Sequence, residues 1–219
     1  MLYKKIYKIY NSDWKKQSFG YIKERGNKMA NSKLIVIEGA QGAGKTTYTD
    51  FIRNTLSYTN LYRLYGTSDT TKSGLPKAEK MYDALLDYIE KLQNASINLL
   101  FDRTFFTEEI YCRLGKKEYS FTEVYNKLLE RFSKFDFEIY YITLYLKDES
   151  VYKERLNREG KSEFKTSKFG VENSIGQQKE YLKLANEIKE KYPNINVINI
   201  QTDRLKEDVE KEIREVLKY

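Results

Sequence analysis

The chain of 219 residues contains no histidine and only one cysteine, Cys112. Without histidine, catalytic triads with an imidazole base and zinc or iron sites with histidine ligands are excluded. A single cysteine excludes an internal disulfide and suits a reducing compartment, so we expect a cytoplasmic protein. Phosphoryl transfer is not excluded, because it depends on positioning, Mg²⁺ and fixed positive charge.

Long apolar runs are also missing. No run approaches the ~20 residues that a transmembrane helix needs, and the N-terminus lacks the apolar core of a signal peptide. We therefore expect no membrane partner. Apolar residues still make up 40% of the chain, which is enough to bury a core, and the length fits one domain better than two.

The net charge of +7 is unevenly distributed. Residues 1–28 hold eight Lys or Arg and two acidic residues, which leaves 31 basic and 30 acidic side chains in residues 29–219. The larger segment is thus almost neutral, which argues against nucleic acid as its partner. We divide the chain into a basic extension, 1–28, and a domain, 29–219. Two interpretations of the extension stay open: an arm that touches nucleic acid or anionic lipid, or a segment upstream of a true start at Met29.

From residue 33 onward, short β-branched or apolar runs alternate with stretches of helical periodicity. This alternation predicts an α/β fold with a five-stranded parallel sheet and helices on both faces, in three layers. The predicted strands are 33–38, 61–65, 97–101, 137–146 and 195–200. The predicted helices are 44–56, 75–93, 105–114, 121–132, one after the fourth strand that Asp148 or Ser150 could cap, 173–190 and a last one marked by Leu205, Val209, Ile213 and Leu217.

One motif lies between the first strand and the first helix. The segment GAQGAGKT, residues 39–46, satisfies G-x-x-x-x-G-K-[ST], the phosphate-binding P-loop. Its glycines allow backbone amides to turn toward phosphate oxygens at a helix N-terminus. Lys45 is predicted to reach the β- and γ-phosphates of ATP, and the Thr46 hydroxyl to ligate Mg²⁺. The predicted nucleotide-binding residues here are Gly39, Ala40, Gln41, Gly42, Ala43, Gly44, Lys45, Thr46 and Thr47.

A second acidic group for the metal follows the third strand. In LLFDR, Asp102 comes directly after an apolar run, so it emerges at the carboxyl edge of the sheet, where ligands bind in open α/β folds. We therefore predict Asp102 as a second metal site residue. A simple ion pair between Asp102 and Arg103 at the strand end is the alternative interpretation.

Three segments together resemble the thymidylate kinase and deoxynucleoside kinase group of P-loop enzymes: IEGAQGAGKTT, FDRTFFTEEIYCR and YKERLNREGK. The resemblance covers about residues 33–205. It implies an ATP- and Mg²⁺-dependent kinase with a short lid over 159–170, in which Asp102 serves the metal and Arg103 holds the acceptor or transferring phosphate. It further implies that Arg155 and Arg158 reach the donor phosphates, and that Thr202 borders the adenine.

The arginines also have a physical rationale. Phosphoryl transfer spreads negative charge over oxygens that a planar guanidinium binds in bidentate fashion. Arg155 and Arg158 lie three residues apart and so project from one side of a helix end. A solvated, charged helix end is the alternative. The predicted catalytic residues are therefore Lys45, Asp102, Arg103, Arg155 and Arg158.

The acceptor site departs from the family pattern. Where family members have a Glu-Pro or Arg-Glu-Pro-Gly segment, this sequence has YRLYGTSDTTKSGLP. Asp69 could act as a base or cap its own loop, and Arg63 with Lys72 could hold a substrate phosphate. Glu38, before the P-loop, could simply fix a loop through backbone hydrogen bonds. The predicted substrate contacts are Asp69, Phe105, Phe106 and Tyr111.

The leading interpretation is a kinase that transfers the γ-phosphoryl group of ATP to a deoxynucleoside monophosphate or a deoxynucleoside. Its partner would be that small-molecule substrate, and the resemblance leaves a homodimer open. Two alternatives remain. A polynucleotide 5′-kinase shares these motifs but needs a basic groove, and a nucleotide-dependent switch would hydrolyse slowly and phosphorylate no small molecule.

Overall fold

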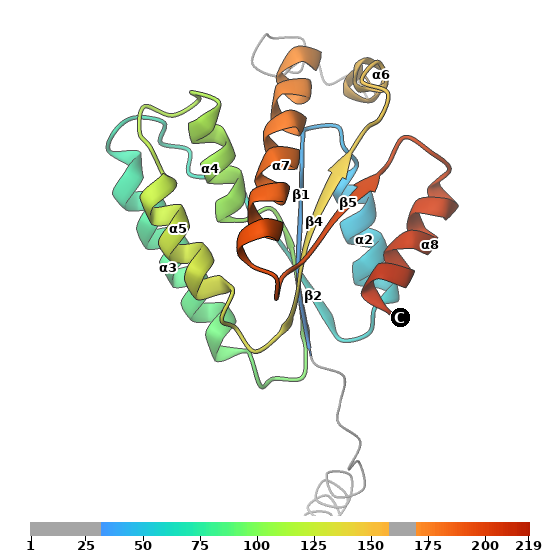
Figure 1. Cartoon of the computed structure of the whole chain (residues 1–219), viewed down its shortest axis with the longest axis horizontal. Helices are drawn as coiled ribbons and strands as arrows, with labels where there is room; N and C mark the ends of the chain where they lie inside the picture. The colour runs from blue at the N-terminus through green and yellow to red at the C-terminus, as the bar shows by residue number, and fades with distance from the viewer. Residues whose placement is uncertain (1–31, 158–169) are drawn as a thin grey trace, which may run out of the picture. The chain divides into compact units, whose positions relative to one another are not determined.

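The computed structural model describes residues 32–157 and 170–219, which Figure 1 shows in colour. Five parallel strands form one sheet in the order β2-β3-β1-β4-β5. Their bounds are β1 Lys33–Gly39, β2 Thr59–Arg63, β3 Asn98–Asp102, β4 Glu138–Tyr145 and β5 Asn196–Gln201. The strand that leads into the P-loop is therefore the central one.

Helices cover both faces of this sheet (Figure 1). Helices α2 (Lys45–Thr55) and α8 (Lys206–Leu217) lie on one face. Helices α3 (Gly74–Lys91), α4 (Phe105–Arg113), α5 (Thr122–Phe132) and α7 (Val171–Lys191) lie on the other. The short helix α6 (Val151–Asn157) follows β4.

The central strand shows why the sequence adopts these layers. Successive side chains of a strand point to opposite faces. Leu34 and Val36 pack in the core under α3, α4, α5 and α7, whereas Ile35 and Ile37 pack in the core under α2 and α8. Because both faces are covered, all of β1 is buried, and its sequence is a continuous apolar run rather than an alternating one.

The predicted α/β class, the five parallel strands and the helices on both faces are confirmed. The second strand was placed two residues late: it spans Thr59–Arg63, not 61–65. Thr59 and Asn60 pair with β3 although they are polar, because β2 is an edge strand in which only Leu61 and Tyr62 pack against the two cores. The predicted extension 1–28 and residues 158–169, which hold most of the predicted lid, lie outside the described residues.

All five strands end at the same edge of the sheet. Gly39, Arg63 and Asp102 end β1, β2 and β3, and Tyr145 and Gln201 end β4 and β5. This parallel arrangement brings side chains that are far apart in sequence to one surface. Within 32–157 and 170–219, no helix has both the length and the apolar character that crossing a bilayer requires.

Candidate functional site

A cavity of about 1070 Å³ lies at the carboxyl edge of the sheet. Its volume is comparable with the largest small-ligand pockets, which reach about 1000 Å³. Among the described residues, one carboxylate (Asp102) and six cationic side chains line it. The cations are Lys45, Arg63, Arg103, Arg155, Arg204 and Lys206. Such a lining favours a ligand with several negative charges.

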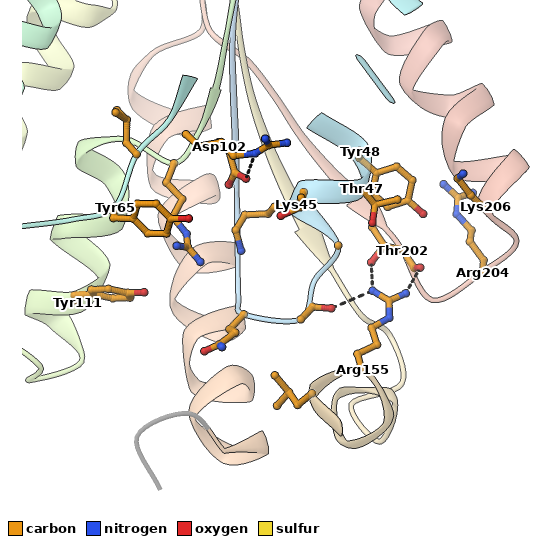
Figure 2. Close-up of a pocket in the computed structure, with 18 residues that line it drawn as sticks. Lys45, Thr47, Tyr48, Tyr65, Asp102, Tyr111, Arg155, Thr202, Arg204 and Lys206 are labelled. Atoms are coloured by element: carbon orange, nitrogen blue, oxygen red, sulfur yellow. Dashed lines mark hydrogen bonds and ion pairs between the residues drawn. The ribbon is translucent and has the colours of Figure 1, made fainter. Parts of the chain in front are cut away.

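The cavity has two ends (Figure 2). Figure 2 shows Tyr65 and Tyr111 on one side of Lys45, and Tyr48, Arg204 and Lys206 on the other. We call the first side the α4 end, formed by Leu64, Tyr65, Arg103 and Tyr111. The second side is the α8 end, formed by Tyr48, Arg155, Thr202, Arg204 and Lys206.

The P-loop lies between these ends and has the backbone that its glycines predict. Gly39 has a φ of 144°, and a Cβ atom there would lie 2.6 Å from the carbonyl oxygen of Leu144. Gly44 is the N-cap of α2 in the left-handed conformation, with a φ of 94°. The amides of the first turn of α2 have no carbonyl partner within the helix, so they are available to anionic oxygens.

Most of the predicted nucleotide-binding residues line the cavity. Gln41, Gly42, Gly44, Lys45, Thr46, Thr47 and Thr202 belong to its lining. Ala40 and Ala43 are fully buried and pack in the cores beneath the loop. With Gly39, they shape the loop rather than its exposed surface.

Lys45 projects back into the loop. Its Nζ donates hydrogen bonds to the carbonyl oxygens of Gly39 and Ala40 at 2.7 and 2.8 Å. Burial, followed by the nearby Arg103 charge, lowers the pKa of Lys45 to about 7, although Asp102 and Glu38 oppose this shift. A polyphosphate in the cavity would supply the missing negative charge and stabilise the protonated amine.

Asp102 and Arg63 meet at the ends of β3 and β2. Arg63 Nε lies 3.8 Å from Asp102 Oδ2, and an Arg63 Nη2 hydrogen bond to Asp50 holds the guanidinium from the other side. The predicted alternative, a pair of Asp102 with Arg103, is therefore not the ion pair formed: the partner is Arg63. Asp102 and the Thr46 hydroxyl both line the cavity and are oxygen donors, the ligand type that Mg²⁺ prefers.

Arg103 enters the α4 end from a left-handed backbone conformation, with a φ of 71°. Its own amide donates to the carbonyl oxygen of Ile37 at 3.1 Å. Within the described residues, its buried Nε has no hydrogen-bond partner. A buried guanidinium nitrogen without a partner next to a cavity indicates that a ligand oxygen is its natural acceptor.

Arg155 lies at the α8 end and binds the P-loop directly. Its Nη1 donates to the carbonyl oxygen of Gly42 and to Thr202 Oγ1, both at 3.1 Å, and its Nη2 donates to the Thr202 carbonyl oxygen (Figure 2). The Thr202 hydroxyl in turn donates to the carbonyl oxygen of Ala43 at 2.8 Å. The structure thus brings Arg155, Thr202 and the P-loop together, whereas Arg158 lies outside the described residues.

The predictions for Phe105 and Phe106 as substrate contacts are wrong. Both side chains are fully buried in the core on the α4 face, where they stack on each other and pack against Phe132. They therefore present no surface to a ligand. Tyr111, about one and a half turns further along α4, does line the cavity, as expected.

Asp69 does not belong to the cavity lining, so its predicted substrate contact has no support. Its carboxylate accepts hydrogen bonds from Lys77 and Ser73, and from both the amide and the hydroxyl of Thr71. These donors, Lys77 first, hold the pKa of Asp69 well below its usual range. Asp69 is the cap of the loop before α3, the second of its two predicted roles. Lys72 likewise does not line the cavity.

Six lining residues were not predicted: Tyr48, Leu64, Tyr65, Leu156, Arg204 and Lys206. Tyr65 is 77% exposed. The positive charges just after the last strand were the only sequence signal for Arg204 and Lys206. No local signal distinguishes Tyr48 or Tyr65 from the other tyrosines among the 20 in the chain.

Glu38 lies beneath the cavity and is fully buried. It fixes a backbone turn, as one interpretation held, but the turn is the one after β3: Glu38 accepts from the Thr104 amide at 2.8 Å and the Thr107 hydroxyl at 2.7 Å. Burial raises the pKa of Glu38 to about 7, although both hydrogen bonds and the charges of Arg103 and Lys45 oppose the shift.

No protein-family model and no curated protein matches this sequence. The fold nevertheless matches solved structures. A thymidylate kinase from Candida albicans is 16% identical over 87% of this chain and 92% of its own, with a TM-score of 0.62. A deoxyadenosine kinase from M. mycoides with bound dCTP is 20% identical over 84% and 98%, with a TM-score of 0.55.

A thymidylate kinase from Ehrlichia chaffeensis is similar to the same extent, at 16% identity over 85% of this chain and 99% of its own, with a TM-score of 0.55. At these identities the likeness establishes a shared fold. The predicted resemblance to the thymidylate kinase and deoxynucleoside kinase group is confirmed at that level.

Proposed function

We propose that this protein is a Mg²⁺- and ATP-dependent kinase that transfers the γ-phosphoryl group to a deoxynucleoside monophosphate. The observation that carries the proposal is the cavity: among the residues that the structure describes, one P-loop, one carboxylate and six cationic side chains line a single space. A catalyst of phosphoryl transfer needs such a site, because it works mainly by positioning phosphates and neutralising their charge.

ATP would occupy the P-loop and the α8 end. Lys45 would bind the β- and γ-phosphates, and the amides that begin α2 would bind their remaining oxygens. Thr202 would border the nucleoside part, and Arg155, already joined to it by hydrogen bonds, would reach the donor phosphates. Arg158 remains a predicted donor-phosphate contact.

The cavity lining offers oxygen ligands for Mg²⁺. In the described part of the chain, no three His, Cys, Asp or Glu side chains form a metal site by themselves. Mg²⁺ in nucleotide sites is usually held by one or two protein oxygens together with phosphates and water, so Thr46 and Asp102 fit it. When bound, Mg²⁺ would neutralise charge on the β- and γ-phosphates.

The acceptor would bind at the α4 end. Arg103, with Arg63 beside Asp102, offers guanidinium groups to an acceptor phosphate. A hydroxyl acceptor needs a base to take its proton, but Asp69 is occupied by four donors and Asp102 is the one carboxylate in the described lining. A phosphate monoester is already largely ionised at neutral pH, with a second pKa of about 6, so its oxygen can attack without such a base.

In the transfer itself, an oxygen of the acceptor phosphate forms a bond to the γ-phosphorus while the bond to the leaving ADP oxygen breaks. Lys45, Arg103 and Arg155 would surround the equatorial oxygens, which carry negative charge in the transfer. Backbone contacts fix Arg155 against the P-loop, whereas Lys45 would exchange the carbonyl oxygens of Gly39 and Ala40 for phosphate oxygens.

A second candidate is a deoxynucleoside kinase, because deoxyadenosine kinases share the fold. In that case Asp102 would have to take the proton of the attacking hydroxyl. The proposal keeps the predicted cytoplasmic location and a small-molecule partner, with a homodimer still untested.

The test is transfer of label from γ-labelled ATP, with and without Mg²⁺. Acceptors are the natural deoxynucleosides, their monophosphates and a 5′-hydroxyl oligonucleotide. Lys45→Ala should lower the rate of transfer by about 10³-fold. Lys211→Ala, which removes an exposed lysine of α8 outside the lining, should not.

Labelled diphosphate that depends on Lys45 is the expected product. Labelled deoxynucleoside monophosphate would move the assignment to the second candidate, and a labelled oligonucleotide would indicate a polynucleotide 5′-kinase. ATP binding without any labelled acceptor would contradict all three and favour a nucleotide-dependent switch.

A further inference from the structure

Arg103 combines two properties that no other residue in the described lining shares. It is a non-glycine residue with a positive φ, 71°, and it carries the positive charge of the α4 end. Such a residue keeps a left-handed backbone only where its surroundings hold it there. The direction of its side chain therefore depends on whatever fixes the turn between β3 and α4.

The end of β1 fixes this turn at two successive amides. The Arg103 amide donates to the carbonyl oxygen of Ile37 at 3.1 Å, and the Thr104 amide donates to Glu38 Oε1 at 2.8 Å. The first bond continues the pairing of β1 with β3. The second is made by a side chain, and it holds the residue immediately after Arg103.

The other oxygen of Glu38 ties the turn to two helices. Glu38 Oε2 accepts from the Thr107 hydroxyl in the first turn of α4 at 2.7 Å. Thr107 Oγ1 lies 2.9 Å from the hydroxyl of Tyr181 on α7. Glu38, Thr107 and Tyr181 are each at most 1% exposed, so water does not compete for these bonds.

Glu38 itself is fully buried and does not belong to the described lining of the cavity. A buried carboxylate costs free energy unless it is well bonded, and replacement by an apolar group is often neutral for stability. Its bonds to the Thr104 amide and to the first turn of α4, rather than to groups elsewhere in the core, are what indicate a role. Glu109 on α4 offers a comparison, because it is equally buried but binds Arg113 and Thr122 away from the cavity.

We propose that Glu38 is a positioning residue, which holds the Thr104 amide and the first turn of α4 so that Arg103 points into the cavity. The inference rests on the proposed function, because it assigns Arg103 to the phosphate that is transferred or accepted. Glu38 acts through Arg103 and is not itself a catalytic residue.

A double-mutant cycle on the transfer reaction tests this inference. Glu38→Ala should lower kcat by about 10- to 100-fold, the usual size of such indirect effects, while the KM for ATP stays within about threefold. In an Arg103→Ala background, the same Glu38→Ala change should lower kcat by no more than about threefold, because residues that act as a unit are not additive. Additive losses would overturn the proposal.

Two further variants distinguish a positioning role of Glu38 from a contribution to stability alone. Glu38→Gln keeps an oxygen that can accept the Thr104 amide, and should recover most of the lost kcat. Glu109→Ala is the matched control: it removes an equally buried carboxylate and should lower thermal stability without this loss of kcat. If Glu109→Ala lowers kcat as much as Glu38→Ala does, Glu38 has only a structural role.

Hydrogen exchange gives a readout that does not need transfer activity. In Glu38→Ala, the Thr104 amide should exchange at least about tenfold faster, while the amide of Leu100 in β3 keeps its protection. Glu109→Ala should leave the Thr104 amide unchanged. Unchanged exchange at Thr104 in Glu38→Ala overturns the positioning role. Absence of transfer by the wild-type protein would instead overturn the proposed function, and exchange at Thr104 would still decide the role of Glu38.

Discussion

The P-loop and the α4 end of the cavity are built in different ways. The P-loop is eight consecutive residues whose backbone is predicted to do most of the binding, with glycine at the positions of positive φ. The α4 end takes Leu64 and Tyr65 from the end of β2, Arg103 from the end of β3 and Tyr111 from α4. A site made of local backbone is visible in a sequence, whereas a site made of distant side chains depends on how the elements pack.

Glu38 lies at the junction of the two regions, and a pH measurement tests its burial. Burial raises the pKa of Glu38 from 4.5 to about 7. Between these values the unfolded chain has released a proton that the folded protein retains, so the folded state loses stability as pH rises. We expect the free energy of unfolding of the wild type, measured relative to Glu38→Gln, to fall by about 3 kcal/mol from pH 4 to pH 8. Urea unfolding of both proteins across this range measures it. A difference in unfolding free energy that does not change with pH would contradict the raised pKa of Glu38.

Adding a single methyl group at Gly39 should distort the P-loop. Gly39→Ala places a Cβ atom 2.6 Å from the Leu144 carbonyl oxygen at a φ of 144°. We expect a loss of about 2 kcal/mol in unfolding free energy, together with weaker ATP binding. Gly115→Ala is the control, because Gly115 also has a positive φ, 66°, but has no atom within 4 Å of its added Cβ. It should cost about 1 kcal/mol and leave ATP affinity unchanged. Equal effects of the two substitutions on stability and ATP binding would contradict a close approach of residue 39 to the Leu144 carbonyl oxygen.

A substitution at the α4 end should weaken binding of the acceptor and leave binding of ATP unchanged. Tyr65 is exposed and lines the cavity, so its ring can stack on a nucleobase. Tyr65→Ala should raise the KM for the acceptor about tenfold, with the KM for ATP unchanged. Tyr58→Ala removes a tyrosine that is 81% exposed but outside the lining, and should change neither constant. A change in the KM for ATP alone would show that the two ends are assigned the wrong way round.

The smallest effect is expected at Asp69. Its carboxylate already binds four donors in its own loop and does not line the cavity. Asp69→Ala should therefore change kcat with any acceptor by less than about twofold, and act mainly on the stability of the start of α3. Loss of transfer to a deoxynucleoside in this variant would restore Asp69 as a base and favour the second candidate function.

The elements of the fold could be predicted almost completely, because central strands and amphipathic helices have distinct periods. The error in β2 came from its position at the edge of the sheet. Thr59 and Asn60 are polar but pair with β3, while the apolar pair Leu64 and Tyr65 leaves the sheet to line the cavity. Edge strands are partly solvated, so hydrophobicity marks their ends poorly.

Helix α4 shows, within a single element, the same limit of prediction from the sequence. Phe105, Phe106 and Tyr111 are all aromatic and all follow Asp102 closely, so the sequence offered no means to rank them. The packing of α4 on the sheet and on α5 turns Phe105 and Phe106 into the core and leaves Tyr111 at the cavity. A helix places its residues about 100° apart, so its rotation decides which side chains a ligand can reach.

The sequence by itself determined the P-loop, the parallel sheet and the placement of Asp102 at the carboxyl edge. Each follows from local backbone preferences or from a strand that must end where its apolar run ends. Only the tertiary structure decided that Asp102 pairs with Arg63 and that Glu38 holds the turn beside Arg103. These contacts join residues whose separation in space depends on the packing of whole helices and strands, which no local pattern encodes.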